Sequence, residues 1–435
     1  MGNKSVKSFQ LWLLFLWMTI SMGGSILNAQ FHEFPYTTSI YDFINYDSNQ
    51  VEFFGDTGNF LSLYDKLDSV INFGKGQINI VVIGGSHIQA DIYSGQLRNR
   101  FQSFYGGQNG GMGLIFPYRL ARTNTPYGYH FDYTGQWETC RNVEKNKICR
   151  LGMAGIMAVT KDSLSSLTLK MEPENPIPYK LGGIKVLHRT DSLSFRIKFD
   201  SAVYKSLYIN KEKSFTEIIF RYPVDSFRLE IVQTDSLQTA FELYGFVPIN
   251  QSNGIILHNI GINGAATSSF LRCELMESQL ALIQPDLVIF GLGINDAYGR
   301  RFDEQTFERN YDSLIQMVNR VNPNAAILLT TNNDSYLYKR YINRNGLLVQ
   351  ETMKQLSQNH NIGLWDMFEI MGGLNSIQKW KKTGLAKYDM VHFTREGYIL
   401  LGDLLFDALI KSWGEYLYSK QIPNQKSIQQ LTNNQ

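Results

Sequence analysis

The chain has 435 residues, 43% of them hydrophobic, which is enough for two folded units with separate cores. Its 41 Lys and Arg residues nearly balance its 39 Asp and Glu residues, and the formal net charge is +2. A charge balance this even lacks the basic footprint of nucleic-acid-binding proteins, so we expect no nucleic-acid partner.

The N-terminal residues predict export. Lys4 and Lys7 precede an apolar run over residues 11–22, and residues 27–29 are typical of a cleavage site. We interpret residues 1–29 as a signal peptide and expect a periplasmic or extracellular protein. The apolar run is short for a membrane span, so we expect no stable membrane insertion.

The first expected elements are a helix and a buried strand. Residues 78–83 are mostly β-branched, as in a parallel strand buried on both faces. Gly84 and Gly85 end this strand, and a helical pattern begins near Ala90. Ser86 is therefore expected in the turn at the strand's carboxyl end, where open α/β sheets bind ligands. An amphipathic helix is predicted ahead of the strand by apolar residues at helical spacing: Phe60, Leu63, Tyr64, Leu67, Val70 and Ile71.

A β domain is expected next. Residues 195–199 and 227–231 alternate apolar and charged side chains, as strands with one buried face do. Asp-Ser, Gly-Gly and Pro-containing stretches between such segments supply turns, so we predict an inserted β-sandwich over residues 125–250. The sequence leaves open whether this sandwich binds carbohydrate or only shapes a cleft.

Two further core strands, expected over residues 254–260 and 285–290, each end in a polar loop. Gly264 follows the first strand, and a glycine lets a backbone N–H approach a ligand closely. Asn295 and Asp296 follow the second strand. The Asn295 amide could donate to an oxygen that gains negative charge, a contribution of roughly 3 kcal/mol. A plain loop and an Asn-Asp turn are the alternatives.

Alternation of helix and strand resumes after this loop. Residues 307–318 carry apolar side chains at helical spacing, and residues 325–330 predict the next strand. We therefore expect an α/β, doubly wound parallel sheet whose core spans residues 30–124 and 251–420. The Gln- and Asn-rich residues 421–435 predict a disordered tail.

Asp389 and His392 lie in one short loop ahead of an apolar helix expected over residues 395–413. A three-residue offset can bring both side chains to one side, so that the carboxylate accepts from one imidazole nitrogen while the other nitrogen faces Ser86. The carboxylate would fix the tautomer and stabilise the imidazolium. Ser86, His392 and Asp389 are therefore candidate catalytic residues, with a capped loop and a surface histidine as the alternative.

These segments resemble the conserved blocks of the SGNH, or GDSL-type, hydrolase family. The blocks here are Gly85-Ser86-His87, Asn259-Ile260-Gly261 with Gly264, Gly293-Ile294-Asn295-Asp296 and Asp389-Met390-Val391-His392. The resemblance implies a flavodoxin-like parallel sheet, with Ser86 as nucleophile, His392 as base and Asp389 as its partner. It also implies an oxyanion hole made by the backbone N–H groups of Ser86 and Gly264 and by the Asn295 amide. The family signature usually has Asp before the serine, where this chain has Gly85.

A closer resemblance is to bacterial peptidoglycan O-acetylesterases, on residues 84–91, 106–113 and 261–265. Those enzymes carry an inserted β-sandwich similar to carbohydrate-binding modules, and a long interval separates Ser86 from Gly264 here. The resemblance implies an exported serine esterase that removes acetyl groups from a cell-wall glycan by a two-step acyl mechanism, without a cofactor.

Other functions stay open at this point. The same site could deacetylate another polysaccharide such as xylan, act as a lipase or transfer the acyl group to a second sugar. A core that has lost activity would leave a glycan-binding protein. The sequence does not determine the oligomeric state.

His87, Asn263 and Asp296 adjoin the blocks and are further candidate pocket residues, although His87 could merely pack. The histidines are scattered without metal-ligand spacing, so we expect no metal. Cys140 and Cys149 could close a small loop through a disulfide.

A third cysteine, Cys273, lies in an expected helix, and we expect it to be a free buried thiol.

Overall fold

The computed structural model describes residues 39–172 and 177–432, which belong to one compact unit. The signal peptide predicted over residues 1–29 lies outside them. None of the described helices combines the length and the apolar character that a membrane span requires.

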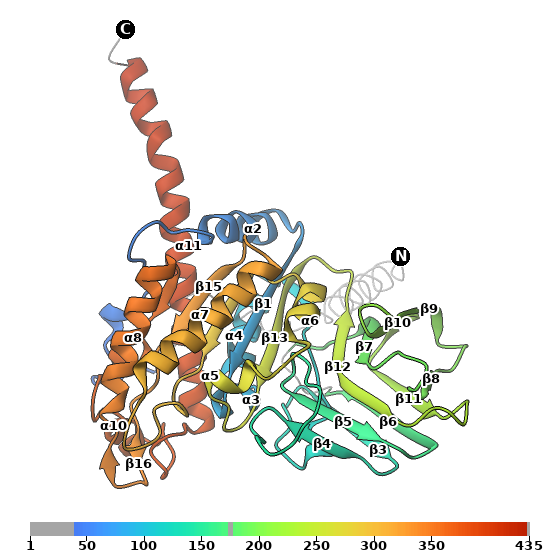
Figure 1. Cartoon of the computed structure of the whole chain (residues 1–435). Coiled ribbons are helices and arrows are strands. Elements are labelled where there is room, and N and C mark those ends of the chain that lie inside the picture. Colours follow the sequence, from blue (N-terminus) through green and yellow to red (C-terminus); the bar gives the residue numbers. More distant parts are fainter. Residues whose placement is uncertain (1–38, 173–176, 433–435) are drawn as a thin grey trace, which may run out of the picture. The chain divides into compact units, whose positions relative to one another are not determined.

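A parallel sheet forms the centre of the described chain (Figure 1). Its six described strands lie in the order β18-β15-β14-β1-β13-β2, and every pairing is parallel. They are β1 (Gln77–Gly84), β2 (Asn109–Met112), β13 (Gly254–Gly261), β14 (Leu287–Gly291), β15 (Ala326–Thr330) and β18 (Gly363–Trp365). Apart from the short edge strand β2, the strand order is the 2-1-3-4-5 order of flavodoxin-like folds. The predicted α/β fold class is confirmed.

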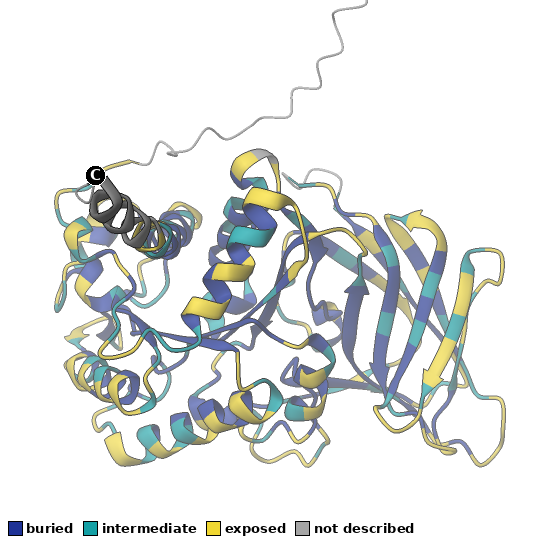
Figure 2. Cartoon of the chain, turned by 90° about the horizontal axis from the view of Figure 1, so that it is seen from above, coloured by how far each residue is buried: buried dark blue, intermediate teal, exposed yellow. Residues whose placement is uncertain are grey.

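Helices cover both faces of this sheet. One face carries α2 (Phe60–Phe73), α4 (Tyr93–Ser103) and α11 (Arg395–Thr432), and the other carries α6 (Met276–Ile283), α7 (Glu304–Val321) and α8 (Asn345–His360). Figure 2 shows the strands between these layers as buried. Ile80, Val81 and Val82 of β1 are at most 1% exposed, which explains their β-branched and apolar character. The six apolar residues that predicted the first helix are the buried residues of α2.

The chain between β2 and β13 forms the predicted β-sandwich from two antiparallel sheets. Their strand orders are β4-β5-β12-β7-β10-β9 and β3-β6-β11-β8. The strands are β3 (Tyr129–Thr134), β4 (Glu138–Arg141), β5 (Ile156–Thr160), β6 (Leu164–Met171), β7 (Leu181–His188), β8 (Arg196–Lys198), β9 (Tyr204–Asn210), β10 (Phe215–Val224), β11 (Ser226–Val232) and β12 (Phe241–Ile249). Along β11, buried Phe227, Leu229 and Ile231 alternate with Arg228 and Glu230. The alternating pattern in the sequence therefore marks the face that is turned to the core.

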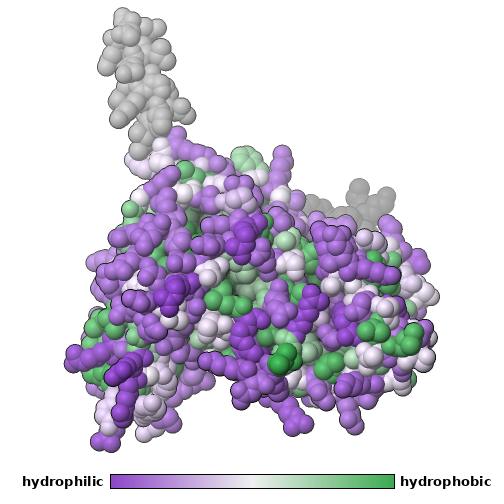
Figure 3. Space-filling model, in the orientation of Figure 1, coloured by the Kyte–Doolittle hydropathy of each residue, from purple (hydrophilic) through white to green (hydrophobic). Residues whose placement is uncertain are grey.

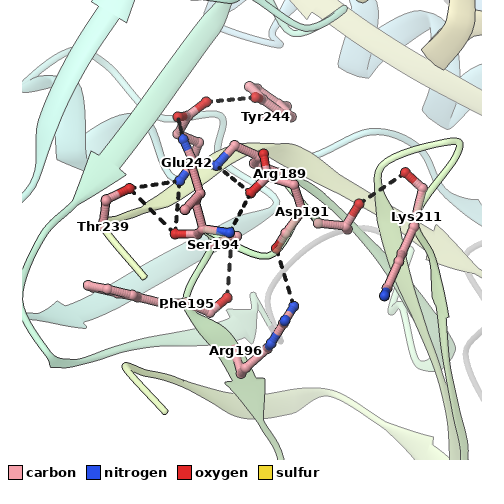
Figure 4. A network of polar contacts seen from close by, with 11 residues as sticks. Arg189, Asp191, Ser194, Phe195, Arg196, Lys211, Thr239, Glu242 and Tyr244 are labelled. Carbon is pink, nitrogen blue, oxygen red and sulfur yellow. Dashed lines mark hydrogen bonds and ion pairs between the residues drawn. The ribbon is translucent and has the colours of Figure 1, made fainter. Parts of the chain in front are cut away.

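A polar network joins the two antiparallel sheets (Figure 4). Arg189 follows β7 and donates to Glu242 of β12 at 2.5 Å and to the Thr239 hydroxyl at 3.2 Å. It also donates to the carbonyl of Leu193, ahead of β8, at 3.1 Å. The Tyr244 hydroxyl donates to the second Glu242 oxygen at 2.9 Å. Because the guanidinium and the carboxylate bind each other and their neighbours, we interpret this network as structural.

Cys140 of β4 and Cys149 form a disulfide, and Cys273 is a buried free thiol, as the sequence suggested. At the other end of the chain, α11 continues to Thr432. The helical backbone over residues 421–432 differs from the disordered tail predicted there. Gln accounts for four of these twelve residues and favours helix, whereas Pro423 does not.

Three neighbouring strands of the parallel sheet end level with one another. Gly84 of β1 lies beside Gly261 of β13 on one side and beside Gly291 of β14 on the other. The loops that follow these strands therefore leave the sheet side by side. The strand order reverses between β1 and β14, and open sheets bind ligands at such a point.

The polar segment that follows β15 is buried, and one of its residues, Asp334, binds the first turn of a short helix. Asp334, 1% exposed, accepts a hydrogen bond from the Ile377 N–H at 3.0 Å at the start of α10 (Ile377–Lys382). Burial raises the pKa of Asp334 to about 6, although backbone hydrogen bonds oppose the shift. This carboxyl group therefore holds its proton more tightly in the folded chain than in the unfolded chain.

Gly261→Ala should destabilise the fold because a Cβ at this position would lie 2.6 Å from the Gln89 Cα and from the Ile88 carbonyl carbon. Backbone atoms cannot rotate away, so we expect a loss of about 1–3 kcal/mol in the free energy of unfolding, measured by urea denaturation. Gly414→Ala is the control. It lies in α11 with open space around it, and it should gain about 0.5–1 kcal/mol. Equal stabilities for the two variants would contradict the close approach.

The raised pKa of Asp334 predicts a pH dependence of stability. Its contribution is fully present below the unfolded pKa near 4 and is lost as the pH rises through about 6, a fall of up to about 3 kcal/mol. Asp334→Asn should flatten that part of the stability profile, measured as the urea midpoint from pH 4 to pH 7. As a control, Asp303→Asn removes a carboxylate whose pKa is lowered by hydrogen bonds from Thr306, so it should not flatten the fall. A wild-type profile in Asp334→Asn would refute the prediction.

Candidate active site

Ser86 opens the short helix α3 (Ser86–Gln89) directly after β1. Its Oγ lies 2.8 Å from the Nε2 of His392. The Nδ1 of His392 lies 2.9 Å from the Oδ2 of Asp389. The structure thus brings the three predicted catalytic residues, which lie at opposite ends of the chain, into one hydrogen-bonded series. Such a series supplies a hydroxyl nucleophile, a base and a carboxylate that orients the base.

The loop that holds His392 is fixed by hydrogen bonds. The second oxygen of Asp389 accepts from the backbone N–H of Val391 at 3.0 Å and of His392 at 2.9 Å. Burial pushes the pKa of Asp389 upward, but these two hydrogen bonds and the His392 ring together hold it below its usual value. Asp389 is therefore ionised at neutral pH and can stabilise a positive charge on His392.

Asn295 lies against the backbone next to Ser86. A Cβ on Gly85 would lie 3.1 Å from the Asn295 Nδ2, so the glycine that replaces the usual Asp leaves room for this amide. The same Nδ2 donates to the Ala265 carbonyl at 2.9 Å, which engages one of its two hydrogens. The second hydrogen has no hydrogen-bond acceptor among the described residues and stays available as a donor.

Two backbone donors adjoin this amide. The Ser86 N–H lies at the start of α3, where a helix leaves its first N–H groups unpaired. Gly264 has φ +82° and open space where a side chain would be, and among the described residues no acceptor is bound to its N–H. These three donors are the ones that the family resemblance implies for an oxyanion hole, and that role stays a prediction.

Asp296, which the sequence suggested as a pocket residue, binds the start of a neighbouring helix. Its carboxylate accepts from the Thr267 N–H at 3.1 Å and from the Thr267 hydroxyl at 2.6 Å. Burial raises the pKa of Asp296, while the hydrogen bonds from Thr267 lower it. Because Thr267 opens α5 (Thr267–Phe270), Asp296 joins the Asn295 loop to the Gly264 loop and keeps the two donors together.

Asn263 joins the site to the start of the insertion. Its N–H donates to the Gln89 Oε1 at 2.7 Å, and its amide donates to the Asn124 side chain at 2.6 Å. The Gln89 amide in turn donates to the Thr123 hydroxyl at 2.9 Å. Sequence reasoning did not single out Gln89, although it stands only three residues after Ser86 in the matched block.

His87 packs against His392 and Tyr398. Its ring centroid lies 5.3 Å from that of His392, and its Nδ1 lies 2.7 Å from the Tyr398 hydroxyl. Burial, followed by the neighbouring His392, lowers the pKa of His87 to about 3, so the ring is neutral at physiological pH. Its Nε2 is buried without a hydrogen-bond partner among the described residues.

A small cavity of about 30 Å³ adjoins His87 and is large enough for water but not for an acyl chain. Asn333, which lines it, donates to the Val391 carbonyl at 3.0 Å and so supports the loop of His392. The polar run over residues 330–334, directly after a buried strand, is the signal by which this residue could have been found. Among the described residues, no group of three His, Cys, Asp or Glu side chains could hold a metal ion.

Comparisons with known proteins agree with this geometry. Residues 247–400 match the model of the GDSL-like Lipase/Acylhydrolase family. The match includes the loops of Gly264, Asn295 and His392 but not Ser86. No curated protein matches the chain in sequence.

Several solved structures are similar in fold. A peptidoglycan O-acetylesterase matches 84% of this chain and 99% of its own length, with a TM-score of 0.70 and 21% identity. A lipase/acylhydrolase from Enterococcus faecalis matches 38% of this chain and 78% of its own, with a TM-score of 0.30 and 21% identity. An acetyl xylan esterase matches 35% and 80%, with a TM-score of 0.28 and 22% identity. Residues 247–400 thus match a GDSL-like lipase/acylhydrolase domain, and the chain as a whole shares the fold of a peptidoglycan O-acetylesterase.

Proposed function

We propose that the protein is an exported O-acetylesterase that removes acetyl groups from peptidoglycan. The observation that carries the proposal is the series Ser86–His392–Asp389, with separations of 2.8 and 2.9 Å at the carboxyl end of β1. The signal-peptide pattern of residues 1–29 supports export. The fold shared with a peptidoglycan O-acetylesterase over 84% of the chain supports the substrate.

In the first step, Ser86 attacks the acetyl carbonyl while the His392 Nε2 takes the hydroxyl proton. The carbonyl oxygen gains negative charge and accepts from the N–H groups of Ser86 and Gly264 and from the Asn295 amide. Asp389 stabilises the imidazolium that forms. The tetrahedral intermediate then collapses, and His392 passes its proton to the departing sugar hydroxyl, which leaves an acetyl-serine.

In the second step, water attacks the acetyl-serine. His392 takes a proton from this water, the same donors hold the oxyanion, and acetate leaves as Ser86 regains its proton. The side chains of His392 and Asp389 are each 34% exposed, so water reaches the reacting centre. This exposure favours hydrolysis over transfer of the acyl group to a second sugar, because a transferase must exclude water.

Acetate release from O-acetylated peptidoglycan should depend on Ser86. Ser86→Ala removes the nucleophile, so we expect kcat to fall by at least about 10³-fold, measured as acetate released from wild-type and variant protein. Ser313→Ala is the matched control, because its exposed hydroxyl bonds only to the Arg309 carbonyl of its own helix. Release from acetylated xylan alone would move the function to another polysaccharide, and no release from either glycan would contradict the proposal.

His392 and not His87 should act as the base. His392→Ala should lower kcat by about as much as Ser86→Ala, since the two residues act as one unit. His87→Ala removes a neutral ring that contacts Tyr398, so we expect less than about a tenfold loss with p-nitrophenyl acetate as substrate. Equal losses in the two variants would overturn the assignment of the base.

A further inference from the structure

A cluster of cations and tyrosines, all exposed except the half-buried Lys381, lies beside the loop of His392. We call this cluster the lysine–tyrosine rim, and it consists of Tyr338, Lys339, Arg340, Tyr341, Lys381 and Tyr388. The first three form the turn between the short strands β16 (Tyr336–Leu337) and β17 (Tyr341–Ile342), and Tyr341 begins β17. Lys381 lies near the end of α10, and Tyr388 precedes Asp389.

Tyr388 is the centre of the rim. Its side chain is 73% exposed, and the ammonium groups of Lys381 and Lys339 lie 4.3 and 5.6 Å from its ring centroid. The hairpin also contacts the catalytic loop, because the Tyr336 N–H donates to the Met390 carbonyl at 3.0 Å. Two positive charges and an aromatic face thus lie next to the loop of His392.

The positive charge of this region is not neutralised by the protein. Residues 298–301, 338–344 and 379–388 contain no acidic residue. Among the described residues, none of their cations forms an ion pair with a carboxylate: Arg300, Arg301, Lys339, Arg340, Arg344, Lys379, Lys381, Lys382 and Lys387. The nearby carboxylates of Asp334 and Asp389 bind Ile377 and the catalytic loop instead. Figure 3 shows strongly hydrophilic side chains over the corner that α10 and β16 occupy in Figure 1.

The same hairpin has a strained turn. Tyr338 and Lys339 have φ values of +53° and +61°, a conformation that favours glycine and asparagine. Tyr and Lys therefore do not serve the turn itself. Residues with a strained backbone concentrate at functional sites. Here the turn exposes the side chains of Lys339 and Tyr338 to solvent.

We propose that the lysine–tyrosine rim binds the carboxylates of an anionic acetylated glycan and thereby holds the strand with its ester at Ser86. The proposal rests on the proposed esterase function and narrows its substrate class. The ammonium groups of Lys339 and Lys381 attract carboxylates, while the exposed face of Tyr388 offers an apolar surface for a sugar ring. Lysines are flexible point charges, so they suit carboxylates that recur along a polymer in varied positions.

Two polymers would supply this chemistry. Peptidoglycan carries carboxylates on its peptide side chains, and other polysaccharides carry them on uronic acid residues. An acetylated neutral glycan such as glucomannan supplies none. The expected behaviour is therefore a preference for anionic over neutral acetylated glycans, reflected in KM and weakened by salt because the rim is exposed.

Charge reversal tests the proposal. Lys339→Glu combined with Lys381→Glu should raise KM for O-acetylated peptidoglycan at least tenfold with kcat nearly unchanged, and it should weaken the salt dependence of KM. Lys205→Glu combined with Lys213→Glu is the matched control, because both lysines are exposed on the sandwich and the net charge changes equally. Hydrolysis of p-nitrophenyl acetate should stay at the wild-type rate in both pairs, since this small ester does not need the rim.

A second variant separates binding from folding. Lys339→Gly relieves the positive φ, so it should keep or raise the unfolding midpoint while it raises KM for the anionic glycan about threefold. The proposed role of the rim would be refuted by an unchanged KM in Lys339→Gly or by an equal rise of KM in the control pair. An equal rise of KM for acetylated glucomannan would refute it as well.

An amidase removes the peptide carboxylates from peptidoglycan but frees one lactyl carboxylate on each muramic acid, whereas acetylated pectin carries uronic acid carboxylates, so the two substrates together identify the source of the carboxylates. If charge reversal no longer changes KM once the peptides are removed, the rim binds the peptide carboxylates. If charge reversal raises KM for pectin, the rim binds uronic acid carboxylates. If peptidoglycan released no acetate while pectin did so with a rim-dependent KM, the proposed function would fail and the rim would stand. If peptidoglycan released acetate but charge reversal left KM unchanged, only the proposed role of the rim would be wrong.

Discussion

The close approach of backbone segments at the ends of β1, β13 and β14 is the constraint on which the rest of the site depends. Gly84, Gly261 and Gly291 lie side by side in register, so three loops leave the sheet together. Gly261 contacts the backbone of α3, which leaves no room there for a Cβ. Gly85 admits the Asn295 amide in the same way. The oxyanion donors meet at Ser86 because side chains are missing where backbones must touch, and Asp296 then fixes two of the loops to each other through Thr267.

The position of His392 depends on a different set of contacts, which come from the segments that follow β15. The Asn333 amide, from the segment after β15, donates to the carbonyl of Val391, and the Tyr336 N–H donates to that of Met390. Met390 has φ +55°, an uncommon conformation that these contacts help to maintain. The loop can therefore present both Asp389 oxygens inward, one to the backbone and one to the imidazole. The strand order, which brings β15 next to β14, places these contacts beside the loop of His392.

The sequence predicted what depends on local patterns and missed what depends on long-range contacts. Runs of β-branched residues mark buried strands, and alternation of apolar and polar residues marks the strands of the sandwich. Both the parallel sheet and the insertion could therefore be predicted from the sequence. Ser86 follows a strand and Asp389 and His392 precede a helix, and the sequence marks both of these boundaries. The anchoring role of Asp296 was not accessible, since Thr267 lies far from it in sequence. The same holds for Tyr398, whose contact with His87 joins residues 311 positions apart. A polar run marks Asn333 in the sequence, but its contact with the Val391 carbonyl could not be predicted.

The place of the insertion links the sandwich to the chemistry. The sandwich leaves the core after Thr123 and Asn124, and both contact Gln89 of α3. Asn124 also accepts from Asn263, which immediately precedes the Gly264 donor. A displacement of the sandwich base would therefore move the serine helix and the oxyanion loop together, through hydrogen bonds and not through the sheet.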